Sequence, residues 1–240
     1  MAILAIENLE KNYGGRKVVN DVSMSVESGV VVGLLGPNGA GKTTTFYLTI
    51  GMVTPDAGVV RIDEKEVTAD PMYIRARKGI GYLPQETSVF RKLSVRDNLM
   101  AILETLPLHR DEMSQRSDSL LDELGILHLA KQKAAVLSGG EKRRLEIART
   151  LATDPAFILL DEPFAGVDPL AVIDIKNIVR HLRDRGIGVL ISDHNVRETL
   201  EVCDQAYILN DGRVIESGPP EKIIASKTAR KIYLGDEFHL

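Results

Sequence analysis

The chain has 240 residues, of which 44% are hydrophobic and 27% are charged, and its formal net charge is −4 at pH 7. This composition is ordinary for a globular protein, and it lacks the basic excess of most nucleic-acid binders, so we expect no nucleic-acid partner. A single cysteine, Cys203, excludes an internal disulfide and fits a reducing compartment. No apolar run approaches the roughly 18 residues of a membrane span, and the first residues lack the basic leader of a signal peptide.

The first third of the chain alternates short β-rich segments with turns and one helix. The first two segments favour an antiparallel pair or a small sheet. The third is a continuous apolar run, which is typical of a strand buried on both faces, and a glycine-rich turn and a helix beginning near Lys42 follow it. Strands are expected at residues 2–9, 18–26, 30–35, 59–62 and 80–83.

The middle of the chain, from about Ser94 to Ala152, has a different character. Leucines and isoleucines recur there at helical spacing, and no segment has the alternation of a strand. We interpret residues 94–152 as a helical subdomain that is inserted into an α/β core.

The last third returns to strand-like runs at 157–160, 188–191 and 206–209, with a helix at about 169–185. Asn210-Asp211-Gly212 is a strong hairpin signal. The alternation predicts an α/β fold with a mostly parallel sheet, helices on both faces and a small antiparallel β subdomain. We expect a single domain over 1–240, made of a core (1–93 and 153–218), the helical subdomain (94–152), and a C-terminal helix and tail (219–240).

A phosphate-binding loop is the strongest motif. The pattern G-x-x-x-x-G-K-[ST] is matched in full, after a buried strand and before a helix, by Gly36-Pro37-Asn38-Gly39-Ala40-Gly41-Lys42-Thr43. The glycines allow several backbone N–H groups to face one anion, and the helix N-terminus adds partial positive charge. Lys42 is expected to reach the β- and γ-phosphates of ATP, and Thr43 to offer a hydroxyl to Mg²⁺.

A second motif is the apolar run 157–160, which delivers Asp161 and Glu162 at the carboxyl end of a strand. Alone, this pattern is often a strand that enters a polar loop. Beside the phosphate loop, we expect Asp161 to hold Mg²⁺ and Glu162 to polarise the attacking water.

A third motif, Leu137-Ser138-Gly139-Gly140-Glu141, opens a helical run with the form of a capping box. It can be a helix cap and nothing more. The paired glycines, however, let a phosphate approach the backbone closely. Because the chain has only one lysine-bearing loop, a head-to-tail dimer is one solution, in which each signature closes over the ATP of the other copy.

Together these motifs resemble the ATP-binding subunits of ABC transporters along essentially the whole chain. The resemblance implies roles for four further residues: Tyr13 stacks on adenine, Gln85 senses Mg²⁺ and the membrane partner, Asp168 crosses the dimer interface, and His194 contacts the γ-phosphate. Thr44 joins the nucleotide-binding set. The signature ends in Glu141 where the family often has Gln, and the Asp168 loop reads Gly-Val-Asp instead of Ala-Leu-Asp; neither change removes a group needed for hydrolysis.

A narrower resemblance is to the ATPases of lipopolysaccharide export transporters. It implies a homodimer on the cytoplasmic face of the inner membrane, bound peripherally through two integral membrane subunits. Phe90 and Leu93 would supply apolar anchors for a helix of that partner and Arg91 a donor, although Phe90 can also be a core residue. The strings that carry this resemblance are residues 82–86, 89–95, 161–169, 193–200 and 233–238.

Three other functions fit parts of the sequence. The ATPase of a branched-chain amino-acid importer has similar loops, but the segment around Phe90 and the C-terminal string favour export. A soluble ABC ATPase of DNA repair or translation would have long coiled coils or two cassettes. A P-loop kinase would lack the signature at Ser138–Glu141.

Overall fold

The computed structural model describes residues 1–235 and 237–238. Asp236 lies outside the described residues, as do positions 239–240, so part of the expected C-terminal tail is not described. No helix in the described part of the chain is both long enough and apolar enough to cross a lipid bilayer.

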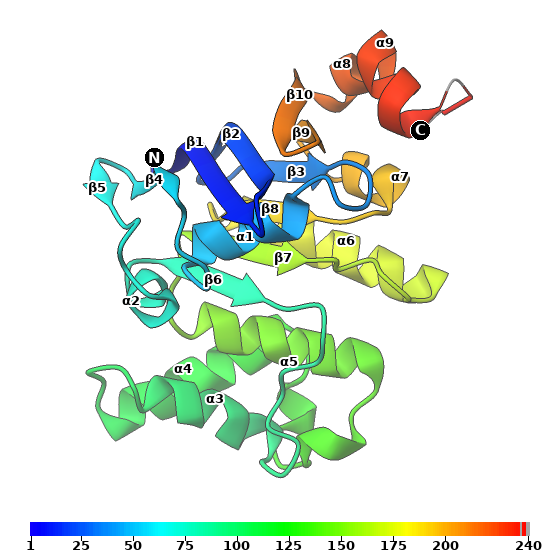
Figure 1. Cartoon of the computed structure of the whole chain (residues 1–240). Coiled ribbons are helices and arrows are strands. Elements are labelled where there is room, and N and C mark those ends of the chain that lie inside the picture. The colour runs from blue at the N-terminus through cyan, green and yellow to red at the C-terminus, as the bar shows by residue number, and fades with distance from the viewer. Residues whose placement is uncertain (236, 239–240) are drawn as a thin grey trace. The chain divides into compact units, whose positions relative to one another are not determined.

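The chain divides into two compact units (Figure 1). The first unit contains residues 1–82 and 156–240, and the second contains residues 83–155. The expected helical segment 94–152 falls within the second unit.

A small antiparallel sheet occupies the N-terminal part of the first unit, with the strand order β2-β1-β4-β5. The two expected early strands do pair antiparallel, and Leu4 lies opposite Val26. Every second residue in the later part of β2 is buried, which is the period of a strand with one covered face. The bounds are β1 (Ile3–Tyr13), β2 (Arg16–Glu27), β4 (Ala57–Ile62) and β5 (Lys65–Glu66).

A second, larger sheet has the order β10-β9-β3-β8-β7-β6. Strand β3 is parallel to β8 and β9, β7 is parallel to β8, and only the β9–β10 hairpin is antiparallel among the pairs described. The mixed α/β fold expected from the sequence is therefore confirmed (Figure 1). The bounds are β3 (Val31–Leu35), β6 (Ile80–Leu83), β7 (Phe157–Asp161), β8 (Gly188–Ser192), β9 (Gln205–Asn210) and β10 (Arg213–Gly218).

The expected hairpin is also present between β9 and β10. Its two turn residues, Asp211 and Gly212, have φ angles of 46° and 74°. Positive φ at both positions is the requirement of the type I′ turn, which matches the twist of the strands that it joins.

Strand β3 separates two hydrophobic cores because consecutive side chains point to opposite faces of a sheet. Leu34 packs in the main core with Phe46 of α1, whereas Leu35 packs in a second core with Leu200 and Ile223 of α7 and α8. The helices of this unit are α1 (Lys42–Ile50), α2 (Met72–Arg77), α6 (Pro169–Asp184), α7 (Val196–Leu200), α8 (Pro220–Ala225), α9 (Lys227–Ala229) and a π-helical turn (Arg230–Leu234).

The second unit is built from α3, α4 and α5, which pack against one another. Ser94 caps α3 by accepting a hydrogen bond from the Asp97 backbone N–H at 3.0 Å, as expected for a serine at this position. Leu99, Leu103 and Leu121 are fully buried. The bounds are α3 (Val95–Leu103), α4 (Arg110–Glu123), α5 (Gly139–Leu151) and 3₁₀ turns at Leu127–Leu129 and Ala134–Val136.

Arg75 holds the C-terminal end of α1, although it is 1% exposed. Its Nη1 donates to the carbonyls of Leu48 and Thr49, both at 2.7 Å. Its other nitrogens donate to the carbonyls of Thr68 at 2.7 Å and Asp70 at 2.9 Å. The guanidinium therefore satisfies two carbonyls that the end of α1 leaves without helical partners.

We expect Arg75→Met to lower the midpoint of thermal unfolding by about 6–12 °C, corresponding to about 3 kcal/mol. The apolar replacement removes the guanidinium donors from two buried and two partly buried carbonyls. Circular dichroism of the full chain measures this change. Arg77→Met is the matched control, because Arg77 lies exposed on the same helix, and equal midpoints for the two variants would contradict the role of Arg75.

Candidate nucleotide site

The phosphate loop joins β3 to α1 with a backbone that only glycine adopts easily. Gly36, Gly39 and Gly41 have φ angles of 145°, 78° and 103°. A Cβ on Gly36 would lie 2.1 Å from the Leu209 carbonyl oxygen, and one on Gly41 would lie 2.6 Å from the Val18 carbonyl oxygen. A Cβ on Gly39 would meet nothing within 4 Å. Gly36 and Gly41 thus let the loop pack against neighbouring backbone, while Gly39 lies at its open side.

Lys42, the first residue of α1, folds back onto this loop. Its Nζ donates to the carbonyls of Gly36 at 2.6 Å and Pro37 at 3.1 Å. Burial lowers the pKa of Lys42, and the charges of Glu162 and Asp193 act in the opposite direction. The ammonium is therefore inside the cradle and within the field of two carboxylates.

Three parallel strands bring the phosphate loop, Glu162 and His194 to the same edge of the large sheet. Ser192 of β8 lies beside Leu34 of β3 on one side and beside Asp161 of β7 on the other. Because the carboxyl ends of parallel strands coincide, the residues that follow β3, β8 and β7 gather there. The phosphate loop, Glu162 and His194 therefore meet, as the sequence predicts.

Glu162 and His194 lie in contact at this edge. Glu162 Oε2 lies 3.4 Å from His194 Nδ1, and the two side chains are 27% and 51% exposed. The backbone of Glu162 has a φ of 45°, and its N–H donates to the Ser192 carbonyl at 2.7 Å. This left-handed conformation, uncommon for a residue with a side chain, turns the chain at the strand end.

Asp161 is buried beneath these groups, and burial raises its pKa. The hydroxyl of Tyr82 on the neighbouring strand β6 donates to Asp161 Oδ2 at 3.2 Å. Burial, and next the charge of Asp161, raise the pKa of Tyr82 well above its usual range, so the phenol remains a donor. Sequence reasoning did not select Tyr82 as a site residue, because nothing in its own segment indicates which strand lies beside β6.

Asp193 is a second residue that sequence reasoning did not select. It is fully buried and accepts hydrogen bonds from the backbone N–H groups of Phe164 and Asn195, both at 2.8 Å. Burial raises its pKa, and these two hydrogen bonds act against that shift. The sequence does place Asp193 at the carboxyl end of a buried strand and next to His194, and that position could have marked it as a candidate site residue. Asp193 ties the segment after β7 to the segment after β8.

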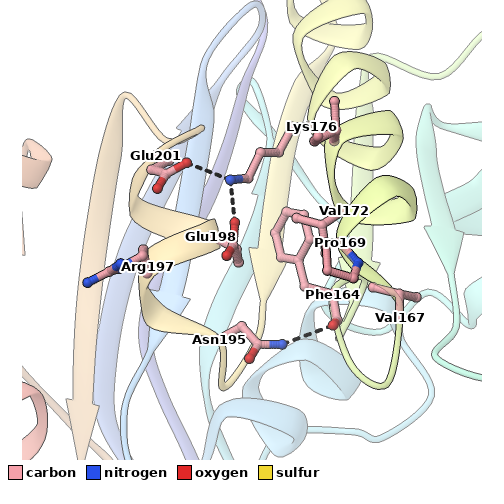
Figure 2. Close-up of a pocket in the computed structure, with 10 residues that line it drawn as sticks. Phe164, Val167, Pro169, Val172, Lys176, Asn195, Arg197, Glu198 and Glu201 are labelled. Carbon is pink, nitrogen blue, oxygen red and sulfur yellow. Dashed lines mark hydrogen bonds and ion pairs between the residues drawn. The ribbon is translucent and has the colours of Figure 1, made fainter.

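A pocket of about 550 Å³ lies between α6 and α7, and Phe164 and Asn195, the two residues bonded to Asp193, are part of its lining (Figure 2). Figure 2 shows the Asn195 amide pointing to the Phe164 carbonyl, which accepts its hydrogen bond at 3.0 Å. On the other side of the pocket, Lys176 forms ion pairs with Glu198 and Glu201. These contacts join α6 and α7 and so fix the segments that carry Glu162 and His194.

Tyr13 and Asp168 are the expected site residues at the margin of the first unit. Tyr13 ends β1 and is 47% exposed, and its hairpin approaches the loop where Val18 of β2 meets Gly41. Asp168 caps α6 by accepting hydrogen bonds from the backbone N–H groups of Leu170 and Ala171, both at 3.0 Å. Thr43 is exposed in the first turn of α1, and Thr44 is half-buried.

The signature belongs to the second unit and forms the expected capping box. Ser138 Oγ accepts from the Glu141 backbone N–H at 3.3 Å, and Glu141 Oε2 accepts from the Ser138 backbone N–H at 2.7 Å. The hydrogen bonds from Ser138 lower the pKa of Glu141. Gly139 and Gly140 open α5, and a Cβ on Gly139 would meet nothing within 4 Å. Backbone N–H groups at this helix start are accessible to an anion.

Gln85 and Phe90 belong to the same second unit, and Phe90 is not a core residue. Gln85 is exposed, and the side chains of Phe90 and Leu93 are 43% and 37% exposed. The Arg149 guanidinium lies 4.3 Å from the centre of the Phe90 ring. Arg91 is also exposed. The three residues expected to contact a partner therefore present apolar and cationic surface on one short segment.

Helix α5 holds this segment through a buried carboxylate. Glu146, 4% exposed, accepts from the backbone N–H of Ser88 at 2.5 Å and pairs with Arg143 at 3.3 Å. Arg143 donates to the Pro84 carbonyl at 3.2 Å, and Arg149 donates to the Ser88 carbonyl at 2.7 Å. The helix that begins at the signature thus fixes the backbone that leads to Phe90.

The chemistry of the donors in the first unit fits Mg²⁺. The Asp161 carboxylate and the Thr43 hydroxyl are hard oxygen ligands. Among the described residues, no group of three or more His, Cys, Asp or Glu side chains could hold a metal ion. Mg²⁺ needs no such group, because it retains several waters and shares its coordination with nucleotide phosphates.

Known proteins resemble this chain in sequence along its whole length. The family described as ABC transporter matches residues 19–165. The lipopolysaccharide export system ATP-binding protein LptB of Escherichia coli (strain K12) is 56% identical over 241 residues, covering 100% of both chains. The corresponding protein of Haemophilus influenzae is 54% identical over 241 residues, also covering 100% of both. A probable ABC transporter ATP-binding protein of Azorhizobium caulinodans is 59% identical, covering 99% of this chain and 84% of that protein.

Solved structures give the same result for the fold. The ADP conformation of MJ1267, an ATP-binding cassette of an ABC transporter, has a TM-score of 0.89 at 32% identity and covers 98% of this chain and 100% of that one. The cbiO1 subunit of a Clostridium perfringens ABC transporter has a TM-score of 0.85 at 31% identity, covering 97% and 95%. The chain belongs to the ABC transporter family and is one of its ATP-hydrolysing, ATP-binding cassettes.

Proposed function

We propose that this chain is the ATPase of a lipopolysaccharide export transporter. The observation that carries the proposal is the 56% identity with LptB of Escherichia coli over the full length of both chains. The segment around Phe90 supports it, because this segment forms part of the resemblance and is exposed as a partner-binding surface requires. In this function the chain lies on the cytoplasmic face of the inner membrane, bound there through its partners.

The phosphate loop binds the triphosphate of ATP. Backbone N–H groups around Gly39 and the N-terminus of α1 face the phosphates, and Lys42 exchanges its present carbonyl partners for β- and γ-phosphate oxygens. Tyr13 stacks on the adenine from the neighbouring hairpin. The loop thus orients the γ-phosphate toward Glu162 and His194.

Glu162 is the general base in this proposal, and His194 is its neighbour at the γ-phosphate. The carboxylate, partly exposed beside His194 at 3.4 Å, accepts the proton of the attacking water. Thr43 and Asp161 would hold Mg²⁺, and the metal when bound neutralises charge that develops on the phosphates. No covalent enzyme intermediate is required.

A homodimer completes each site. The Ser138–Glu141 signature is a second anion-binding helix start without a lysine, so it complements the loop of another copy better than it serves a site of its own. Two ATP molecules would then lie between two chains. Asp168, exposed at the start of α6, would lie at the same interface.

Phe90, Arg91 and Leu93 contact the membrane partner in this proposal. An exposed aromatic ring under a guanidinium and a neighbouring leucine form a small anchor site for a helix. Because Glu146 and Arg149 fix the backbone of this segment, the surface is formed before the partner binds.

We expect Glu162→Gln to reduce ATP hydrolysis by at least about 100-fold while ATP binding persists, because the amide cannot accept the proton of water. Phosphate release measures the rate, and size-exclusion chromatography with ATP detects a retained dimer. Glu66→Gln, at an exposed position on β5, is the control. Brisk hydrolysis by the Glu162 variant would remove this residue from the role of base.

We expect Phe90→Ala to weaken co-purification with the membrane subunits by about 10-fold or more, with ATPase activity of the isolated chain within about twofold of wild type. The change removes the anchor ring but touches no group of the nucleotide site. Tyr73→Ala removes another exposed aromatic ring, on α2, and serves as the control. Lost activity of the isolated chain together with intact assembly would refute the assignment.

A further inference from the structure

The hydrogen bond between Tyr82 and Asp161 can fix the orientation of the Asp161 carboxylate. Asp161 ends β7 at the edge of the sheet where the nucleotide groups gather, and it is 6% exposed. The phenol of Tyr82 reaches Oδ2 from β6, the strand next to β7, at 3.2 Å. A carboxylate held through one oxygen keeps its other oxygen, Oδ1, in a fixed direction.

The ring of Tyr82 is itself fixed. It packs against the main core, and the flanking residues Gly81 and Leu83 are buried. Tyr47, from the phosphate-loop helix α1, packs against the same core. The core therefore holds the Tyr82 ring in place while its hydroxyl reaches Asp161.

We propose that Tyr82 is a positioning residue for Asp161, whose hydroxyl orients the carboxylate for the magnesium ion of Mg-ATP. The inference rests on the proposed role of Asp161 as a metal ligand. Partners that orient a ligand typically change metal affinity or activity by about 10–100-fold when they are removed. A tyrosine that only fills space would have no such effect when phenylalanine replaces it.

The test is a magnesium titration of nucleotide binding, with a non-hydrolysable fluorescent ATP analogue and the full chain. We expect Tyr82→Phe to raise the Mg²⁺ concentration for half-maximal enhancement of binding by about 10-fold. Affinity for the analogue in EDTA and the thermal unfolding midpoint should stay at wild-type values, because the ring and the phosphate loop are unchanged.

Two further variants separate the possible outcomes. Tyr207→Phe is the matched control, because Tyr207 packs against the same core and its hydroxyl accepts from the Ser25 N–H at 3.3 Å, away from Asp161. Asp161→Asn tests the metal ligand and should abolish the magnesium enhancement. Suppose that Asp161→Asn abolishes the enhancement and that Tyr82→Phe needs the same Mg²⁺ concentration as wild type. The positioning role of Tyr82 is then wrong, while the proposed function stands.

Two other results would also overturn the inference. Asp161→Asn with an unchanged magnesium enhancement would remove Asp161 as the ligand, and with it any role of Tyr82 toward the metal. Tyr82→Phe with equally weakened binding in EDTA and in Mg²⁺ would show that the hydroxyl supports the fold of the site and not the metal.

Discussion

The nucleotide site depends on the common edge formed by three adjacent parallel strands, β3, β8 and β7. All three are buried along their whole length, so their registers are set by packing on both faces. A slip of one residue would turn Asp161 and the phosphate loop away from each other and move core side chains to the wrong face. The alignment of loop, carboxylates and histidine is therefore a consequence of the core.

The electrostatics of this edge favour a metal-bound nucleotide over a free one. The charges of Glu162 and Asp193 act on the Lys42 ammonium, and the same two carboxylates act on Asp161. Burial of such groups is unfavourable, and hydrogen bonds from Tyr82 and from backbone N–H groups offset part of the cost. A free triphosphate would add further negative charge. Within the proposed function, a divalent cation held by Asp161 would offset that repulsion.

Local motifs in the sequence predicted most of the residues that gather at this edge of the sheet. The spacing Gly36 to Thr43 fixed the loop, and the apolar run before Asp161 placed a carboxylate at a strand end. Tyr82 could not be found in this way, because it lies 79 residues from Asp161 and only the strand order brings β6 beside β7. Arg75 was missed for a different reason: its partners are backbone carbonyls, which every residue has and which no sequence motif indicates.

The second unit carries both the signature and the Phe90 segment, and helix α5 connects them. Helix α5 begins at the Ser138–Glu141 signature, and further along it Glu146 and Arg149 bind the backbone of Ser88. Arg149 also covers the ring of Phe90. A displacement of the signature by a bound nucleotide would therefore carry the Phe90 surface with it, since α5 holds the backbone of Ser88 through both hydrogen bonds. Within the proposed function, ATP acts on the membrane partner by moving this surface as a whole, without reshaping it.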